Sequence, residues 1–415
     1  MAMLTPYRVL DLTTERGLLC GQMLGDMGAD VVKIEPPGGS AARAIGPFYH
    51  DVPHPDRSLY WWAYNRNKRA ITLDIERDAG QELLLRLVER ADFFIESDNP
   101  GHMARHHLGF DDLAKINPAL IYVSITPFGQ DGPKASYADS DLIIMAAGGP
   151  LILAGDADRP PVRLGVPQAY LHASADAAVA TLAAHHERMR SGLGQHIDVA
   201  AQQSVALATQ AYTLAAPLGS PEAKRISGGV KFGGFDLPLV FPAKDGHVAL
   251  GFLFGSALGV FTAKLMRFIC AQGFCDEATR DKNWLAYGEQ LFSGAEPLAE
   301  FERVKEVVRD FTRSHTKAEL LALALEHGFL ITPVTTVAEV VESQQFESRG
   351  YFQNVAHPEL GESFRYPGPF AKFSATPIEY QRRPPTVGEH NSEVYRDELG
   401  LSEREVAELT RAGVI

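Results

Sequence analysis

The residues with the clearest chemistry lie near the start of a predicted helix. Tyr170 carries a hydroxyl whose ordinary pKa of about 10 leaves it neutral near pH 7. His172 follows two residues later, and a neutral imidazole can act as a general base at that pH. Asp141, from an earlier segment, offers a carboxylate for acid–base work. Structural roles stay open, because Asp141 can cap a helix and His172 can lie on a helix surface.

An alternation of strands and helices positions these residues. Short apolar runs predict buried strands, and apolar residues at helical spacing predict the helices between them. This pattern is typical of an α/β fold with a parallel sheet. The longest predicted helix, Leu171–Arg190, is rich in alanine and free of Gly and Pro. The predicted strands are Arg8–Leu12, Asp30–Ile34, Ala70–Leu73, Asp92–Ile95, Leu120–Ile125 and His196–Val199, and the other helices are Leu18–Met27, Gly80–Arg90 and Ala200–Ala216.

The chain is long enough for two domains, and its composition changes near residue 217. Residues 217–245 are rich in Gly and Pro, which predicts a linker or ligand loop. The predicted division is 1–216 for the N-terminal part of a large domain, 217–245 for the linker, 246–330 for a small domain, and 331–415 for a return linker and the C-terminal part of the large domain. Ser402 and Glu405 form a predicted capping box for a last helix.

Composition and charge argue against several kinds of partner. Hydrophobic residues make up 45% of the 415 positions and charged residues 22%, as in a globular protein. The net charge of −13 argues against a nucleic-acid partner, which would need a basic face. We expect no membrane partner and a cytoplasmic protein, because no apolar run reaches the roughly 18 residues of a span and the N-terminus lacks a signal-peptide pattern.

Two cofactor classes find no support in the sequence. The three cysteines, Cys20, Cys270 and Cys275, lack the spacing of a disulfide framework or a metal site, so no metal is predicted. Gly17, Gly21 and Gly25 do not have G-x-G-x-x-G spacing, which argues against a Rossmann-type dehydrogenase.

Six motifs in a fixed order give the chain a resemblance to a known family. They are Gly28–Glu35 (GADVVKIE), Asn65–Asp74 (NRNKRAITLD), Phe128–Pro133 (FGQDGP), Pro161–Leu171 (PVRLGVPQAYL), Gly192–Val199 (GLGQHIDV) and Gly388–Asn391 (GEHN). In these motifs the sequence resembles the family III (CaiB/BaiF) CoA-transferases, a group that includes formyl-CoA transferase and α-methylacyl-CoA racemase. The resemblance runs from about residue 8 to residue 415.

The resemblance implies a fold, an assembly and substrates. It implies a large Rossmann-like parallel-sheet domain built from both chain ends, a smaller inserted α+β domain and an interlocked homodimer. It also implies that CoA enters as the substrate acyl-CoA, with a small carboxylic acid as second reactant and no permanently bound cofactor. An ordinary surface arginine stays open for Arg105, but the motif favours a phosphate contact, for which its planar fork is suited. The residues that match the family's CoA contacts are Arg43, Leu73, Asp74, Ile75, Pro100, Gly101 and Arg105.

The chain departs from the family at position 170. The family's transferases place an aspartate there, whose carboxylate attacks the acyl-CoA carbonyl and forms a mixed anhydride. Tyr170 stands in its place, and a phenol cannot form an acid anhydride. Ser140 stands where the racemases carry a histidine, which argues against racemase chemistry. Asp141 occupies a position where family members carry Asp or Glu near the active site.

We therefore expect an enzyme that moves CoA between an acyl-CoA and a carboxylic acid, with an atypical site formed by Tyr170, Asp141 and His172. Two alternatives stay open: a CoA-binding protein without turnover, and a diverged acyl-CoA hydrolase, isomerase or lyase. An Asp141 or His172 that points at the thioester favours an enzyme, whereas a closed apolar pocket favours binding alone.

Overall fold

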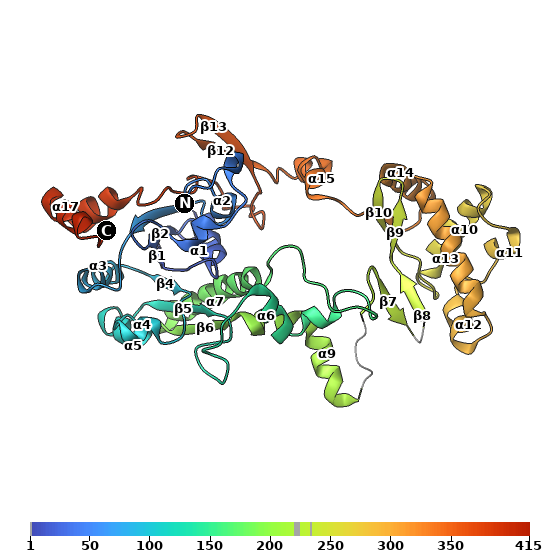
Figure 1. Ribbon diagram of the computed structural model, residues 1–415, viewed down its shortest axis with the longest axis horizontal. Helices are drawn as coiled ribbons and strands as arrows, with labels where there is room; N and C mark the ends of the chain where they lie inside the picture. Colours follow the sequence, from blue (N-terminus) through green and yellow to red (C-terminus); the bar gives the residue numbers. More distant parts are fainter. Residues whose placement is uncertain (1, 220–224, 233–234) are drawn as a thin grey trace. The chain divides into compact units, whose positions relative to one another are not determined.

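The computed structural model describes residues 2–219, 225–232 and 235–415 (Figure 1). The chain divides into two compact units. Unit 1 consists of Met1–Leu151, Leu164–Thr213 and Gln344–Ile415, and unit 2 consists of Ile152–Arg163 and Leu214–Ser343. Residues 220–224 and 233–234 of the predicted linker lie outside the described residues. The domain boundaries drawn from the sequence stay predictions.

A six-stranded parallel sheet forms the centre of unit 1. Its strand order is β3-β2-β1-β4-β5-β6, and each strand runs parallel to its neighbours. This is the order of a doubly wound sheet, in which the chain reverses its direction of winding between β1 and β4. The predicted α/β fold is confirmed. The strands are β1 (Arg8–Asp11), β2 (Asp30–Glu35), β3 (Lys68–Thr72), β4 (Phe93–Glu96), β5 (Ile121–Thr126) and β6 (His196–Ala200).

Apolar side chains cover both faces of this sheet, so apolar residues occur at neighbouring positions of its strands. Val9 and Phe93 face one core, which helices α1 and α7 complete. The next residue of each strand, Leu10 and Phe94, faces the opposite core, to which α3 and the end of the chain contribute. The helices named are α1 (Leu18–Asp26), α3 (Asp78–Val88) and α7 (Ala169–Ser191).

Helix α7 carries residue 170 in its first turn and packs along α1 and β5. Ala173 and Ala177 are fully buried on it, and their small side chains allow a close approach. The helix ends before Gly192, whose φ of 76° is a left-handed conformation that favours glycine. The predicted helix Leu171–Arg190 is confirmed, and the observed one begins two residues earlier.

The end of the chain adds a hairpin and a helix to unit 1. Strands β12 (Gln353–His357) and β13 (Glu362–Tyr366) pair antiparallel within the stretch predicted to be extended. Helix α17 (Glu403–Arg411) begins at the predicted capping box, in which the Ser402 and Glu405 side chains bond reciprocally to backbone groups. The other helices of unit 1 are α2 (Leu59–Tyr64), α4 (His102–Arg105), α5 (Phe110–Ile116), α6 (Asp141–Ala147), α8 (Ala201–Ala206) and α16 (Gln344–Ser348). Helix α9 (Gln210–Ala215) spans the sequence boundary between the two units, and α15 (Val337–Val341) belongs to unit 2.

Unit 2 is built on a three-stranded antiparallel sheet of order β11-β10-β9. Trp284, Tyr287 and Phe301 lie in its core. Two strands, β7 and β8, form a hairpin inside the predicted linker. Within the described chain, no helix combines the length and apolar character needed to cross a membrane. The elements are β7 (Gly229–Phe232), β8 (Phe235–Pro238), β9 (Val240–Ala243), β10 (Gly246–Leu250), β11 (Ile331–Pro333), α10 (Gly259–Ala271), α11 (Glu277–Arg280), α12 (Tyr287–Ser293), α13 (Leu298–Arg313) and α14 (Lys317–His327).

Candidate active site

The carboxyl ends of β1 and β4 lie side by side where the winding of the sheet reverses. In open α/β sheets ligands bind in the crevice outside this point, because the connections leave in opposite directions. Thr14 and Arg16 follow β1, and Ser97 and Asn99 follow β4. The Thr14 backbone N–H donates to Ser97 Oγ at 2.8 Å. Arg16 Nη1 donates to the Ser97 carbonyl at 3.2 Å and to Asn99 Oδ1 at 3.0 Å.

The network continues from Arg16 to Tyr170 through Asp139. Arg16 Nη2 lies 2.6 Å from Asp139 Oδ1, and the Tyr170 hydroxyl donates to Oδ2 of the same carboxylate. Burial, followed by this hydrogen bond, raises the pKa of the Tyr170 hydroxyl above its ordinary value. Tyr170 is therefore a neutral hydrogen-bond donor near pH 7. The sequence analysis did not assign a role to Arg16 or Asp139.

Asp141 is the first residue of α6, but its carboxylate serves α7. Asp141 Oδ1 accepts hydrogen bonds from the backbone N–H groups of Gln168 at 2.6 Å and Ala169 at 2.8 Å. Ser140 is the residue that caps α6, with its hydroxyl on the Ile143 N–H. Asp141 thus holds the segment that carries Tyr170. An acid–base role for Asp141 stays a prediction, as does one for His172, which is exposed on α7.

Two segments predicted to contact CoA lie close together in unit 1. Leu73–Ile75 follow β3, and Pro100–Gly101 precede α4. Glu76, next to the first segment, lies 3.2 Å from His102, next to the second. Leu73 is buried, whereas Arg105 at the end of α4 is exposed and can meet an anion. Gly101 has a φ of 80°, a conformation that side chains other than glycine rarely adopt.

The guanidinium of Arg43, a predicted CoA contact, is bonded on all sides to other groups of the protein. Its guanidinium forms two 2.7 Å bonds with Glu35, and Nη1 lies 2.8 Å from Asp56 Oδ1. Nη2 also donates to the Pro385 carbonyl at 3.1 Å, and the group stacks 3.7 Å from the centre of the Trp61 ring. Arg43 is 1% exposed. A direct phosphate contact by Arg43 stays a prediction, and it would have to replace one of these bonds.

A buried ion network lies at the end of β1, just before the loop that carries Arg16. Asp11, the last residue of β1, lies 2.8 Å from Lys68 Nζ and 3.2 Å from Lys33 Nζ. Burial alone would raise the pKa of Asp11, but the two ammonium groups outweigh it and lower the pKa to about 2. Asp11 Oδ1 also accepts from the Thr13 backbone N–H at 2.9 Å, which fixes the start of the loop that carries Arg16.

Glu96 is a second buried acid that the sequence did not single out. It ends β4, one residue beyond the predicted strand, and is 2% exposed. Burial raises the pKa of Glu96 to about 7. Glu96 lines a cavity of about 250 Å³ together with Ser124 and His196, and the Ser124 hydroxyl lies 2.9 Å from His196 Nε2. The sequence does not predict that Glu96 is buried, because an acidic residue at the end of an apolar run can equally face solvent.

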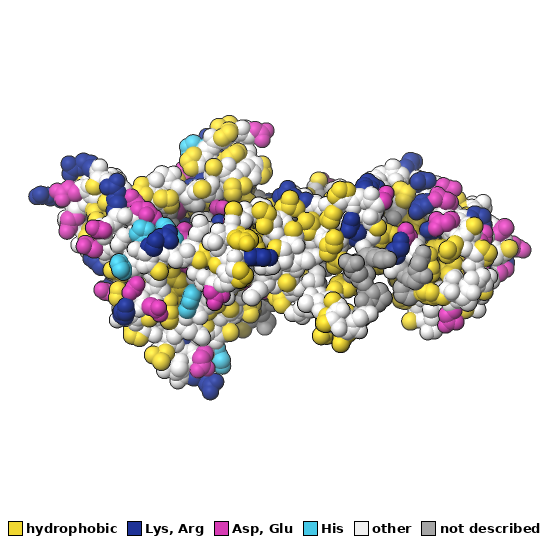
Figure 2. Space-filling view, turned by 60° about the horizontal axis from the view of Figure 1, so that its bottom comes forward, with side chains coloured by type: hydrophobic (Ala, Val, Ile, Leu, Met, Phe, Trp, Pro, Cys, Tyr) yellow, Lys and Arg dark blue, Asp and Glu magenta, His cyan; other side chains and the backbone are white. Residues whose placement is uncertain are grey.

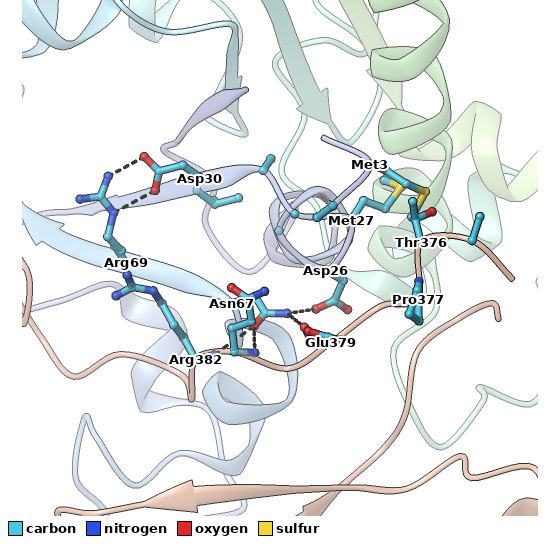
Figure 3. Close-up of a pocket in the computed structure, with 17 residues that line it drawn as sticks. Met3, Asp26, Met27, Asp30, Asn67, Arg69, Thr376, Pro377, Glu379 and Arg382 are labelled. Atoms are coloured by element: carbon cyan, nitrogen blue, oxygen red, sulfur yellow. Dashed lines mark hydrogen bonds and ion pairs between the residues drawn. The ribbon is translucent and has the colours of Figure 1, made fainter. Parts of the chain in front are cut away.

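A larger cavity of about 490 Å³ lies at the opposite, amino ends of β2 and β3 (Figure 3). Two of its acidic side chains have partners in the protein: Asp30 lies 2.6 Å from Arg69, and Asp26 Oδ1 accepts from Asn67 Nδ2 at 2.8 Å. None of the predicted site residues lines this cavity. The candidate active site is therefore at the other end of the strands.

Fold and site together define an α/β protein with a polar side-chain network at the carboxyl ends of a doubly wound sheet. The chain belongs to CoA-transferase family III, whose family model matches residues 4–391. The motif-based resemblance is thereby confirmed.

Curated relatives match the chain over nearly its whole length. Subunit BbsE of the succinyl-CoA:(R)-benzylsuccinate CoA-transferase of Thauera aromatica is 33% identical, over 99% of this chain and 97% of the relative. The succinyl-CoA–D-citramalate CoA-transferase of Chloroflexus aurantiacus is 32% identical, over 99% of this chain and 98% of the relative. The formyl-CoA:oxalate CoA-transferase of Streptomyces avermitilis is 30% identical, over 98% of each chain.

Solved structures share the fold. A CaiB/BaiF family protein from Brucella suis superposes with a TM-score of 0.80 at 26% identity, covering 96% of this chain and 100% of that one. The D175A mutant of Rv3272 from Mycobacterium tuberculosis gives a TM-score of 0.72 at 26% identity, covering 94% of this chain and 98% of that one.

Proposed function

We propose that this protein transfers CoA from an acyl-CoA to a small carboxylic acid. The observation that carries the proposal is the similarity along the whole chain to curated CoA-transferases that use succinyl-CoA or formyl-CoA. In this proposal the exposed Arg105 and the turns at Leu73–Ile75 and Pro100–Gly101 bind the nucleotide end of CoA. The thioester then lies near Tyr170, with Asp141 and His172 as the neighbouring acid–base candidates.

The proposed exchange needs a group that breaks the C–S bond. In the covalent route a carboxylate attacks the thioester carbonyl, and CoA leaves as a thiolate from a mixed anhydride with the donor acyl group. The thiolate then attacks the enzyme's carbonyl of this anhydride, which releases the donor acid and forms an enzyme thioester. The acceptor acid displaces the thiolate to form a second anhydride, and the thiolate attacks the acceptor's carbonyl, which frees the enzyme's carboxylate. The Tyr170 hydroxyl donates its one proton to Asp139, and a phenol cannot take over this attack. The site is therefore atypical, and its reaction depends on another nucleophile, such as the acceptor acid itself.

A second candidate function is a CoA-binding subunit that leaves turnover to another chain. Two observations favour it: the Tyr170 hydroxyl is bound to a carboxylate that Arg16 already neutralises, and one relative is itself named as a subunit. A diverged hydrolase, isomerase or lyase would act on the thioester without an acceptor acid.

We further propose that the chain assembles as an interlocked homodimer. Several apolar side chains on α7 are exposed in the single chain, with Val179 65% and Met189 63% exposed. Figure 2 shows hydrophobic side chains spread among the charged ones on the visible face. Such side chains are more stable in contact with a partner.

The test is exchange by the purified protein. Acyl-CoA donors, including succinyl-CoA and formyl-CoA, are mixed with free carboxylic acids, and the CoA esters formed are measured by mass spectrometry. We expect new esters that depend on the acceptor. Tyr170→Asp should raise the rate at least about tenfold, because it restores a carboxylate nucleophile at the first turn of α7.

Tyr170→Phe is the matched control, because it removes the hydroxyl and adds no carboxylate. No exchange by either the wild type or Tyr170→Asp, together with tight CoA binding, would contradict transfer and support the subunit role. Release of free CoA without any acceptor would support a hydrolase instead.

A further inference from the structure

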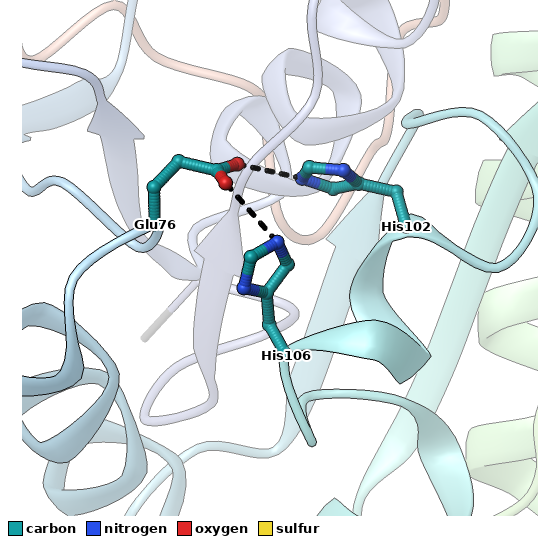
Figure 4. Close-up of side chains that lie close together, drawn as sticks. All are labelled: Glu76, His102 and His106. Atoms are coloured by element: carbon teal, nitrogen blue, oxygen red, sulfur yellow. Dashed lines mark ion pairs between the residues drawn. The ribbon is translucent and has the colours of Figure 1, made fainter.

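Three potential metal ligands converge beside α4 (Figure 4). Glu76 lies between β3 and α3, His102 is the first residue of α4, and His106 directly follows α4. His102 Nε2 lies 3.2 Å from Glu76 Oε1, and His106 Nε2 lies 3.1 Å from Glu76 Oε2. One ligand atom from each of the three residues lies within 4.8 Å of the others.

We propose that Glu76, His102 and His106 bind a transition-metal dication, with Zn²⁺ as the best-suited ion. Two imidazole nitrogens and a carboxylate oxygen form a ligand set that zinc commonly takes in proteins. At metal–ligand distances of about 2.0–2.1 Å, tetrahedral ligand atoms lie roughly 3.4 Å apart. The two Glu76–histidine contacts are within a few tenths of an ångström of that spacing. They reach different oxygens of Glu76, and the ligand atoms lie within 4.8 Å of one another, so binding must bring them closer by up to about 1.4 Å. Three protein ligands leave the fourth position for water or an anion.

Local structure holds the two histidines on one side of the site. Residues four apart share one face of a helix, and the His102 and His106 rings lie 5.0 Å apart between their centroids. Their side chains are 23% and 19% exposed, against 58% for Glu76. Two partly buried histidines thus face a more exposed carboxylate. Arg105 Nη2 lies 3.5 Å from His102 Nδ1, and this exposed guanidinium must turn away when a cation binds.

Substituting Gln81 offers a way to change which ring nitrogen of His106 carries the proton. Its Nε2 donates to the Ile75 carbonyl at 3.0 Å and lies 3.2 Å from His106 Nδ1. With this donor on Nδ1, the ring proton sits on Nε2 and faces Glu76. Metal binding at Nε2 moves that proton to Nδ1, which then needs an acceptor. A carboxylate at position 81 would supply one, as carboxylates behind zinc-bound histidines do.

The test is a zinc titration of the full-length protein after treatment with a chelator and its removal. Calorimetry should show one saturable Zn²⁺ per chain. His102→Ala and His106→Ala should each weaken binding at least tenfold, and Gln81→Glu should tighten it. Co²⁺ should give the visible absorption bands of a tetrahedral site in the wild type but not in the double variant His102→Ala/His106→Ala.

His107→Asn is the matched control, because His107 is exposed beside the cluster and contributes no ligand atom. Its φ of 55° is a conformation that Asn tolerates, so the variant should fold and bind zinc like the wild type. Circular dichroism checks the fold of each variant. Absence of saturable binding by the wild type, or unchanged binding by the double variant, would overturn the zinc site. A Gln81→Glu variant that does not bind more tightly would contradict ligation through His106 Nε2.

Discussion

Asp11 and Glu96 show how differently two buried carboxyl groups can titrate in one sheet. Burial raises the pKa of both, but Asp11 lies between two lysine ammonium groups, which bring its pKa down to about 2. Glu96 has a hydroxyl and a backbone N–H as partners instead, and its pKa stays near 7. A hydrogen bond from a neutral group thus offsets much less of the burial penalty than an opposite charge does.

Glu96→Gln should change how stability depends on pH. The folded pKa of about 7 lies above the ordinary unfolded value of about 4.3, so the folded state binds the proton more tightly between these limits. Wild-type stability should therefore fall as the pH rises from about 4.3 to 7 and level off above. Because glutamine stays neutral, the variant should be more stable than the wild type at pH 8, by up to roughly 3 kcal/mol.

Urea unfolding at pH 5 and pH 8 measures this difference. Glu89→Gln, at an exposed position of the same unit, is the control and should leave the pH dependence unchanged. Equal stability of Glu96→Gln and the wild type at pH 8 would show that Glu96 is ionised without cost in the folded protein.

Single site residues could be located from the sequence, but their contacts could not. Tyr170 was found because it breaks a motif, and Asp141 because a carboxylate stands in a chemically suggestive place. The Arg16–Asp139 pair joins residues 123 positions apart, on loops that start from different strands. No local pattern encodes that pairing. The His102/His106 spacing was present in the sequence, but only the fold brings Glu76 to it.

Among the helices, α7 is the element whose packing matters most for residue 170. Ala177→Leu should destabilise the protein by about 1–3 kcal/mol, because a larger side chain must enter a filled core. Thermal or urea unfolding measures the loss. Ala407→Leu places the same side chain at an exposed position of α17 and should have little effect. Equal losses for both variants would mean that burial at Ala177 is not the cause.

The sequence predicts a helix or strand well where a local pattern of residues marks it. It predicts poorly those short strands that form only because two segments pair with each other. All six strands of the parallel sheet are predicted, because each lies in a short stretch rich in apolar residues. Strands β7, β8 and β9 lie in the segment predicted to be a linker or loop. Gly and Pro mark turns, but they do not reveal which short segments pair across those turns.

For the molecule as a whole, assembly is the property most open to test. Light scattering during size exclusion should give twice the mass of one chain. Val179→Glu and Met189→Glu should lower that mass toward a monomer, because each places a charge where apolar contact is proposed. Leu325→Glu is the control, since Leu325 is 78% exposed on α14 of unit 2. A wild type with the mass of one chain would contradict the homodimer.

The last residues of the chain brace the turn that is predicted to meet CoA. The Asp74 backbone N–H donates to the Val414 carbonyl at 2.7 Å, and Val414 and Ile415 are buried against the same core. A tag, dye or fusion partner attached after Ile415 would therefore emerge beside that turn. A dye at this end would report nucleotide binding. A bulky fusion there would hinder access to the turn, and the weaker binding would then be wrongly attributed to the site itself.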